Sequence, residues 1–385
     1  MKVLIINPLS SGGITQYTIC LSDALQHYSD LILLTSQDVD YEYRSFFDLE
    51  EYKQLKDKIS YKLSFPKSTN RISKIIIYIY NFINIINIVK KNNIDIVHIQ
   101  WPLSVKFDKY LINKLHKLNV KVIFTAHNVV SHENNNMDFL AQKNMLNAYD
   151  KIIVHANCNK KDIIELFNIE EDKIDVIPHG NYLFINSFNK YIEREYALKE
   201  LGLDNNNFYL LFFGYIREYK GLDILLNALS KLDNNIHLII AGSCSNFSKY
   251  DDLIEQFKLD NRVHKFIKYI DLKDFGKYFY ASDAVIFPYK NIYQSGAVQM
   301  AMAFKKPIIV SSVGGLIETI KDNDNGLIFK NEDVYDLIEK INILYKNNEL
   351  RNTIANNGYN YAKNELDWDK IAHNTYNNLY IGNGK

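Results

Sequence analysis

The sequence predicts an α/β protein built from two doubly wound domains. Short apolar runs alternate with segments whose apolar residues recur at helical spacing, which is typical of parallel sheets covered by helices. A polar, irregular stretch at residues 182–207 interrupts this alternation and separates two sets of strands. The chain has 385 residues, enough for about two domains. Because the alternation stops and restarts, two facing domains fit it better than one closed barrel.

The first half of the chain holds six expected strands. They are Val3–Asn7, Leu31–Thr35, Ile94–Ile99, Val120–Ala126, Lys151–Val154 and Lys173–Ile177. Helical patterns are expected at residues 15–28 and 162–167. Gly12 and Gly13 form the first strand-to-helix turn, where paired glycines let the backbone approach a ligand closely. Residues 37–64 are polar and aromatic, and they are hard to assign.

The most apolar segment, Ile75–Val89, is expected to be a buried or half-buried helix of the first domain. It falls short of the ~20 residues that a spanning helix needs, so we predict no membrane span. Its polar stripe consists of Asn81, Asn84 and Asn87. Basic residues flank it on both sides, namely Arg71, Lys74, Lys90 and Lys91. These flanks leave open that the segment lies on an anionic bilayer surface.

The alternation restarts after the polar stretch and gives six more expected strands. They are Tyr209–Phe213, Ile236–Ala241, Val263–Phe266, Ala284–Phe287, Pro307–Val310 and Leu327–Phe329. A helix is expected around Glu193–Leu201, and the helical pattern of Trp368–Tyr380 is expected to pack back on the first domain. The predicted first domain is therefore residues 1–185 with 368–385, and the predicted second domain is residues 186–367.

Composition limits the partners and the compartment of the protein. The 45 basic and 45 acidic side chains cancel, so no general positive field would attract nucleic acid, and no nucleic-acid partner is expected. Cys20, Cys158 and Cys244 lie far apart, which fits a reducing cytoplasm better than a disulfide framework. Met1–Pro8 is interpreted as a first strand and not as a signal peptide. We therefore expect a cytoplasmic protein.

The turn between Tyr209–Phe213 and the leucine-rich helix at Leu222–Ser230 is the strongest candidate site. Gly214 lets the backbone turn, and the start of the following helix offers unpaired N–H groups. Arg217 can hold an anionic oxygen pair in a fork, and Lys220 adds a point charge. This combination predicts a diphosphate site. The alternative is that both cations are solvated charges on an ordinary turn.

The order strand, Gly-x-x-Arg-x-x-Lys-Gly, leucine-rich helix in Leu211–Leu229 resembles the donor-binding turn of family 4 glycosyltransferases, which are nucleotide-sugar enzymes of the GT-B architecture. Further matches follow in the order of the family along most of the chain, and those in the second half are the more specific. They are Gly12-Gly13, Thr125–Asn128, Ile177–Gly180, Ala241-Gly242, Ala281–Pro288, Ala301–Pro307, Val313–Gly315, Glu318 and Asn325–Leu327. The resemblance implies a GT-B fold with two domains facing a central cleft.

The resemblance also implies an activity and its site residues. It implies retaining transfer of a hexose from a nucleotide-diphosphate sugar to a glycan or lipid-linked glycan, in surface polysaccharide or glycoconjugate biosynthesis. The donor would bind mainly to the second domain and the acceptor to the first. The implied catalytic residues are His127, Arg217, Lys220 and Asn291. The implied donor-binding residues are Gly12, Gly13, Gly214, Arg217, Lys220, Gln294, Ser295, Gly296, Gln299 and Glu318.

One departure from the family pattern concerns a pair of glutamates. Where the family has Glu-x7-Glu, this sequence has Asn291 and Gln299, which keep hydrogen-bonding groups but lose charge. This leaves open a catalytically inactive glycosyltransferase-like binding or partner subunit. A sugar-nucleotide epimerase of the same fold would need further carboxylates, which we do not identify in the sequence.

No metal and no cofactor beyond the donor substrate are expected. Asp38 and Asp40 form an Asp-x-Asp triplet, but hard-metal sites need several converging oxygens, so we interpret the pair as surface residues. Arg217, Lys220 and turn amides would meet the diphosphate charge without a metal. The expected partners are the nucleotide sugar and its acceptor. Peripheral association with the inner face of a membrane is left open.

Overall fold

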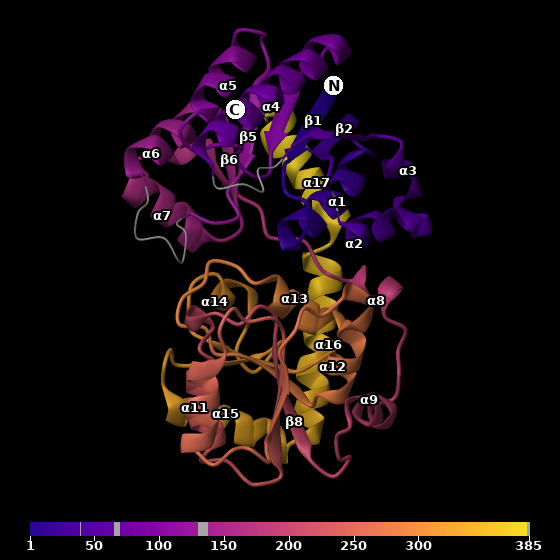
Figure 1. The fold of residues 1–385 in the computed structure, drawn as a ribbon, viewed down its shortest axis with the longest axis vertical. Helices are drawn as coiled ribbons and strands as arrows, with labels where there is room; N and C mark the ends of the chain where they lie inside the picture. The colour runs from indigo at the N-terminus through magenta and orange to yellow at the C-terminus, as the bar shows by residue number, and fades with distance from the viewer. Residues whose placement is uncertain (39, 65–69, 130–137, 383–385) are drawn as a thin grey trace. The chain divides into compact units, whose positions relative to one another are not determined.

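The fold is known from a computed structural model that describes residues 1–38, 40–64, 70–129 and 138–382 (Figure 1). It divides the chain into two compact units. Unit 1 comprises Met1–Gly180 and Asp367–Lys385, and unit 2 comprises Asn181–Leu366. Each unit is a parallel sheet with helices packed on it, so the predicted α/β fold class is confirmed.

Unit 1 contains a seven-stranded sheet in the order β3-β2-β1-β4-β5-β6-β7. Its strands are β1 (Lys2–Asn7), β2 (Asp30–Ser36), β3 (Ile59–Leu63), β4 (Ile96–Ile99), β5 (Lys121–Thr125), β6 (Lys151–Val154) and β7 (Ile174–Val176), and all neighbours pair in parallel. The prediction of six strands in this half is wrong, because β3 lies in the stretch that could not be assigned. It is an edge strand whose only buried residue is Leu63, so it lacks a clear apolar pattern.

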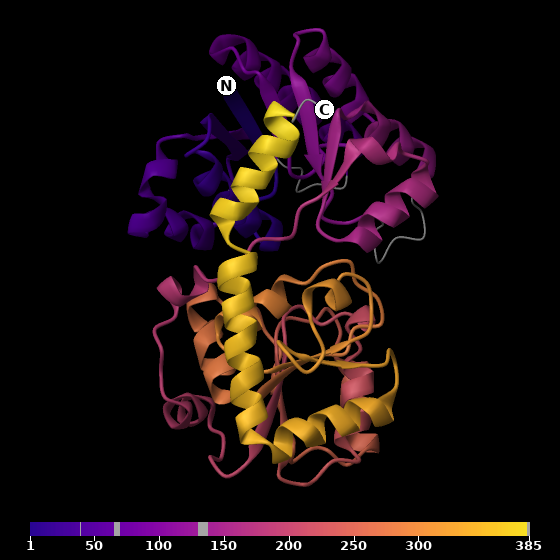
Figure 2. The same ribbon diagram turned by 180° about the vertical axis from the view of Figure 1, so that it is seen from behind.

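The chain end, Asp367–Lys385, belongs to unit 1. Figures 1 and 2 show α17 (Trp368–Asn374), drawn in yellow, beside α1 (Gly13–Leu25). Tyr380 Oη is 2.7 Å from His98 Nδ1 on β4. The other described helices of unit 1 are α2 (Tyr41–Arg44), α3 (Lys53–Lys56), α4 (Arg71–Asn92), α5 (Asp108–His116), α6 (Phe139–Ala148) and α7 (Asn157–Phe167).

Helix α4 differs from the prediction in its length. It has 22 residues, where the apolar segment 75–89 suggested fewer, and by length and composition it is the one helix of the described chain that could cross a membrane. Its C-terminal half is nevertheless built into unit 1, since Ile85 is fully buried. The Asn81 side chain accepts from Ser64 N at 2.9 Å and donates to Ser64 O at 2.8 Å. The expected polar stripe therefore begins with a residue that bonds the end of β3.

Unit 2 contains a six-stranded parallel sheet in the order β10-β9-β8-β11-β12-β13. Its strands are β8 (Phe208–Phe213), β9 (Ile236–Ala241), β10 (Val263–Phe266), β11 (Ala284–Phe287), β12 (Ile308–Ser311) and β13 (Leu327–Phe329), each within one residue of its predicted bounds at either end. The sheet order reverses between β8 and β11. In α/β proteins, ligands bind beyond the carboxyl ends of the strands at such a reversal.

The helices of unit 2 cover both faces of its sheet (Figure 1). They are α8 (Ile185–Phe188), α9 (Arg194–Leu201), α10 (Leu222–Leu229), α11 (Ser248–Gln256), α12 (Phe275–Ala281), α13 (Gly296–Ala303), α14 (Leu316–Thr319), α15 (Val334–Lys346) and α16 (Asn348–Glu365). The predicted leucine face of α10 is confirmed, because Leu222, Leu225, Leu226 and Leu229 are all fully buried. Helix α10 is thereby fixed at the carboxyl edge of β8.

Candidate functional site

Two loops flank the reversal point of the unit 2 sheet, and they are bonded to each other. One is the turn 214–221 after β8, and the other is the loop 288–295 after β11. Lys290 N donates to Tyr219 O at 2.7 Å, and Lys290 Nζ pairs with Asp223 Oδ2 at 2.7 Å. The two loops therefore hold a fixed geometry at the edge where α/β sheets bind ligands.

Gly221 is the point of closest approach between these loops. Its φ is +69°, and a Cβ built there would lie 1.9 Å from the carbonyl oxygen of Pro288. Any other residue would both strain the backbone and clash with the opposite loop. A glycine is therefore required where the turn passes into α10.

Lys220 and Arg217 are both on the turn, as predicted, but their surroundings differ. Lys220 is half-buried, with its Nζ 5.7 Å from the ring centre of Tyr289 and 3.2 Å from the place of a Cβ on Gly214. Burial, and then the nearby Arg217, lowers the pKa of Lys220 to about 8. Arg217 is exposed, and its guanidinium lies 4.8 Å from the ring centre of Tyr215. An anion at this turn would relieve the cost of holding the Lys220 charge out of water.

The structure brings the remaining predicted residues of unit 2 to the same edge with different exposures. Asn291 and Glu318 are exposed, Gln294 and Gly296 are half-buried, and Ser295 and Gln299 are buried. A Cβ on Gly296 would lie 2.5 Å from Tyr182 Oη, so packing alone accounts for that glycine.

Glu318 belongs to the short helix α14, and the loop before α14 packs on the loop 288–295. A Cβ on Gly314 would lie 1.7 Å from the carbonyl oxygen of Ile292, and Gly315 N donates to Tyr293 O at 3.2 Å. Three strand-end loops, after β8, β11 and β12, thus meet at one edge of unit 2.

In unit 1, the predicted residues Gly12, Gly13 and His127 also follow parallel strands at one edge of the sheet. Gly12 has a φ of +86°, is exposed, and its carbonyl oxygen accepts from Thr15 N and Gln16 N at the start of α1. His127 comes two residues after β5.

His127 lies in a buried cluster, and both of its ring nitrogens have partners. His155 Nδ1 is 3.0 Å from the carbonyl oxygen of Ile177, so this nitrogen carries a proton and donates it. The other nitrogen of a neutral imidazole accepts, and His155 Nε2 therefore accepts from His127 Nδ1 at 3.3 Å. His127 Nε2 is left as an acceptor that faces the side-chain amide of Gln100.

This network also fixes the orientation of the Gln100 amide. With Gln100 Oε1 placed 3.3 Å from His127 Nε2, two acceptors would face each other, and the Gln100 amide nitrogen would be buried with no hydrogen-bond partner. If the side-chain amide of Gln100 is rotated by 180°, its NH2 group donates to His127 Nε2, and both atoms then have a hydrogen-bond partner. Burial and the nearby His155 hold the pKa of His127 well below its ordinary value of 6.5, so the neutral network is the stable one.

Sequence reasoning missed the rest of this cluster. The ring of Tyr17 lies 4.8 Å from the rings of both His127 and His179, and 5.2 Å from that of Trp368. A signal was present, because His127, His155 and His179 follow the adjacent strands β5, β6 and β7. Strand ends that neighbour each other in a parallel sheet place such residues together.

Among the residues that the structure describes, no group of three or more His, Cys, Asp or Glu side chains is arranged to hold a metal ion. His127 and His155 bond to each other, and His155 also donates to the carbonyl oxygen of Ile177. Asp38 and Asp40 are both exposed, as interpreted from the sequence.

Two protein-family models match the chain. A model described as "Glycosyl transferases group 1" matches residues 193–361, and one described as "Glycosyltransferase Family 4" matches residues 11–181. The chain belongs to the family 4 glycosyltransferases. The predicted family membership is thus confirmed by matches to both halves of the chain.

Individual relatives agree with this assignment. The chain is 28% identical over 239 residues to an uncharacterized glycosyltransferase of Methanocaldococcus jannaschii, and the match covers 60% of either chain. It is 24% identical over 284 residues to a D-inositol 3-phosphate glycosyltransferase of Xylanimonas cellulosilytica, 71% of this chain and 66% of that protein. The chain thus spans about two thirds or less of the length of these two relatives.

Among solved structures, Anabaena HepE in complex with UDP and glucose superposes with a TM-score of 0.76. The match covers 99% of this chain and 100% of HepE, at 18% sequence identity. At this identity the likeness shows the fold. The predicted GT-B fold is thereby confirmed.

Proposed function

We propose that this glycosyltransferase moves a hexose, with retention of configuration, from a nucleotide-diphosphate sugar to a glycan or a lipid-linked glycan. The observation that carries the proposal is the turn after β8, where the half-buried Lys220 and the exposed Arg217 adjoin the reversal point of unit 2. The UDP and glucose bound in HepE support a nucleotide-diphosphate sugar as the donor.

The chemistry follows from where charge develops. As the C1–oxygen bond of the donor breaks, negative charge grows on the departing diphosphate, and preorganised cations stabilise that charge more than they stabilise the intact donor. Lys220 is already partly desolvated, so its attraction for the phosphate is screened less than that of an exposed lysine. A loss of about 100-fold or more in turnover is expected when such a group is removed.

The remaining steps need no charged protein base. The new glycosidic bond forms on the face that the diphosphate leaves, and the proton of the acceptor hydroxyl passes to the leaving phosphate oxygen. His127 is neutral and both of its nitrogens have partners within unit 1, so we assign it a positioning role and no proton transfer. Asn291, which replaces a family glutamate, would contribute hydrogen bonds alone.

We place the reaction in the cytoplasm, within surface polysaccharide or glycoconjugate synthesis. We further propose that the reaction needs no metal. Its support is the pair of cations on the turn, which can balance a diphosphate charge directly. Full turnover in chelator is expected. Loss of turnover in chelator, restored by manganese and abolished by changing Asp38 or Asp40, would overturn this part.

A second candidate is a catalytically inactive binding or partner subunit. Asn291 and Gln299 favour it, because both family glutamates are replaced by amides. Such a subunit would bind nucleotides without consuming a sugar donor, so binding and turnover have to be measured on the same protein.

The test combines a thermal-shift screen of nucleotide sugars with a measurement of donor consumption. A donor that binds the folded state raises its melting temperature. Lys220→Ala should abolish most of the shift and of the turnover while leaving the circular dichroism spectrum unchanged, since the side chain is not part of the core. Lys231→Ala, at an exposed lysine that follows α10, is the matched control. An undiminished rate in Lys220→Ala would refute the phosphate assignment, and binding without turnover in the unmodified protein would favour the inactive subunit.

A further inference from the structure

The N-terminal half of α4 presents an apolar stripe to solvent. The stripe consists of Ile72, Ile75, Ile76, Ile79, Tyr80 and Ile83, which are between 40% and 68% exposed. Their spacing of three and four residues places them on one face of the helix. The buried residues of α4 are Asn81, Ile85, Ile86, Ile88 and Val89, most of them nearer its C-terminus. Exposed isoleucines in such a contiguous stripe mark an interaction surface.

Basic side chains lie beside the N-terminal end of this α4 stripe. Helix α4 contains no Asp or Glu, and its first turn carries Arg71 and Lys74. Lys106 and Lys109 stand at the start of the neighbouring helix α5. We call these four residues the basic rim. Lys106 Nζ is paired with Asp138 Oδ2 at 3.3 Å, and both partners are exposed.

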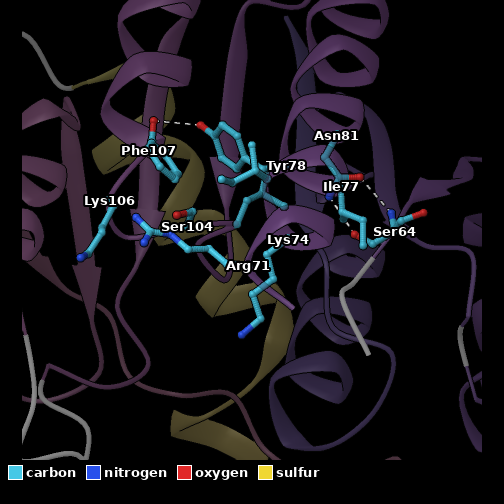
Figure 3. A pocket seen from close by; sticks show the side chains of 11 residues that line it. Ser64, Arg71, Lys74, Ile77, Tyr78, Asn81, Ser104, Lys106 and Phe107 are labelled. Carbon is cyan, nitrogen blue, oxygen red and sulfur yellow. Dashed lines mark hydrogen bonds between the residues drawn. The ribbon is translucent and has the colours of Figure 1, made fainter. Parts of the chain in front are cut away.

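A pocket of about 370 Å³ joins the rim to the stripe. Figure 3 shows the side chains of Arg71, Lys74 and Lys106 around it, with Tyr78 and Phe107 as an aromatic wall. Tyr78 Oη donates to the carbonyl oxygen of Phe107 at 2.8 Å, and this bond holds the two sides of the wall together. The pocket thus offers three cations beside apolar surface, which suits a phosphate group attached to a hydrocarbon chain.

We propose that the α4 stripe and the basic rim dock this protein on an anionic phospholipid membrane, with a headgroup phosphate in the pocket. An amphipathic helix with a basic face lies in the interfacial plane with its apolar face buried among the lipids. Lysine and arginine side chains reach from that depth to the phosphates, and Tyr80 and Phe107 suit the headgroup level. Because the other half of α4 packs into unit 1, the helix lies on the membrane and does not cross it.

Charge decides between this partner and a second copy of the chain. Two α4 stripes in contact would bring two basic rims together, and like charges at an interface oppose association. An anionic bilayer meets both the apolar and the charged part of the surface. The inference is independent of the proposed function, because docking on lipid needs neither donor nor turnover.

The experiment is vesicle flotation of the full chain with phosphatidylcholine vesicles, with and without phosphatidylglycerol. The variants are Ile76→Ser/Ile79→Ser in the stripe and Arg71→Ser/Lys74→Ser in the rim. The matched control is Lys161→Ser/Leu166→Ser, which removes one exposed lysine and one exposed leucine from α7 of the same unit. Circular dichroism checks the fold of each variant, and sedimentation measures self-association.

We expect binding that requires phosphatidylglycerol and weakens with salt. The rim variant should lose about fivefold in affinity for each charge removed. The stripe variant should lose at least about tenfold, and the control should bind like the unmodified protein. Equal binding to both vesicle types, or equal losses in the control, would overturn the proposal. So would stripe variants that abolish self-association and leave vesicle binding intact, since a second copy of the chain would then be the occupant.

Discussion

At the residue scale, the buried histidines of unit 1 are neutral, whereas Lys220 of unit 2 is charged. His127 and His155 share a neutral chain of hydrogen bonds that ends on a backbone carbonyl, and burial keeps both from taking up a proton. Burial makes the charged form of Lys220 less stable than it would be in water, and its pKa is therefore lowered to about 8. The histidines therefore shape unit 1, while Lys220 is the group whose energy improves when an anion arrives.

The first prediction concerns Gln299, which is 1% exposed on α13 and stands where the family has a glutamate. A carboxylate accepts hydrogen bonds from ribose hydroxyls without restriction, and charge-assisted bonds are roughly twice as strong as neutral ones. We expect Gln299→Glu to tighten nucleoside-diphosphate binding by about 1 kcal/mol. It should also lower the melting temperature of the unliganded protein, because a buried carboxylate is desolvated.

Titration calorimetry with UDP, ADP and GDP measures the first effect, and differential scanning calorimetry measures the second. Gln256→Glu is the matched control, because it adds the same charge at an exposed position at the end of α11. Weaker nucleotide binding in Gln299→Glu would mean that Gln299 donates its NH2 group to a phosphate or backbone oxygen. The ribose role of the family glutamate would then not apply to this chain.

At the element scale, the loops after β8 and β11 behave as one part because Gly221 lets them touch. We predict that Gly221→Ala lowers the free energy of unfolding by more than about 3 kcal/mol, from left-handed backbone strain together with a clash. Gly202, the residue that ends α9, has a similar φ of +67° with nothing within 4 Å of the Cβ position. Gly202→Ala should therefore cost only the strain, about 1 kcal/mol.

Urea unfolding followed by far-ultraviolet circular dichroism compares the two alanine variants. Nucleotide binding provides a second readout, because a displaced turn moves Lys220 and Arg217. Equal costs for the two substitutions would show that the loop contact at Pro288 yields easily. The tight link between the two loops would then contribute nothing to the site.

Buried, apolar strands could be predicted from the sequence, whereas an exposed strand and the exposed start of a helix could not. Strands such as β9 and β11 are buried almost throughout and were located within one residue. Strand β3 was missed because its first four residues are exposed or half-buried. Helix α4 begins earlier than its apolar segment predicts, because its first turn is polar and basic. Asn70 caps this turn by accepting a hydrogen bond from Ile72 N.

The same physical difference separates the two halves of the candidate site. Gly214, Arg217 and Lys220 lie within one continuous turn, so their arrangement is readable from spacing alone. His155 and His179 meet His127 only because β5, β6 and β7 are neighbours in the sheet. The order of strands in the sheet cannot be read from sequence spacing, so this contact could not be predicted before the sheet topology was known.

At the scale of the whole molecule, the two units differ in how they can be observed. The chain has two tryptophans, Trp101 and Trp368, and both belong to unit 1. Trp368 lies in the returning segment and contacts Tyr17, so it reports on the attachment of α17 as well as on the sheet. Tryptophan fluorescence therefore follows the unfolding of unit 1, while circular dichroism follows both units.

Unit 1 buries four histidines whose pKa values all lie below the ordinary 6.5. Burial lowers the pKa of His98 to about 3, that of His155 to about 4 and that of His179 to about 3, and His127 lies well below 6.5. The unfolded chain binds protons at these groups below about pH 6.5, whereas the folded unit does not. Acidification thus favours the unfolded state, with the loss growing from about pH 6.5 towards about pH 4.

Two carboxyls of unit 1 act in the opposite direction. Burial raises the pKa of Asp23 to about 6 and that of Asp108 to about 7, so the folded unit takes up protons there before the unfolded chain does. Four histidines against two carboxyls leave a net loss of stability on acidification. We predict that the free energy of unfolding of unit 1 falls by at least about 2 kcal/mol between about pH 7 and about pH 5.

Urea unfolding followed by tryptophan fluorescence at several pH values tests this last prediction. His155→Gln replaces one titrating ring by a neutral amide that can still donate to Ile177 O and accept from His127, so the slope of stability against pH should decrease. His373→Gln is the control, because His373 is exposed on α17, and its slope should match that of the unmodified protein. A stability that is flat or rises on acidification would mean that the folded unit hydrates and protonates these histidines. The neutral hydrogen-bond chain through His127 would then not exist in solution.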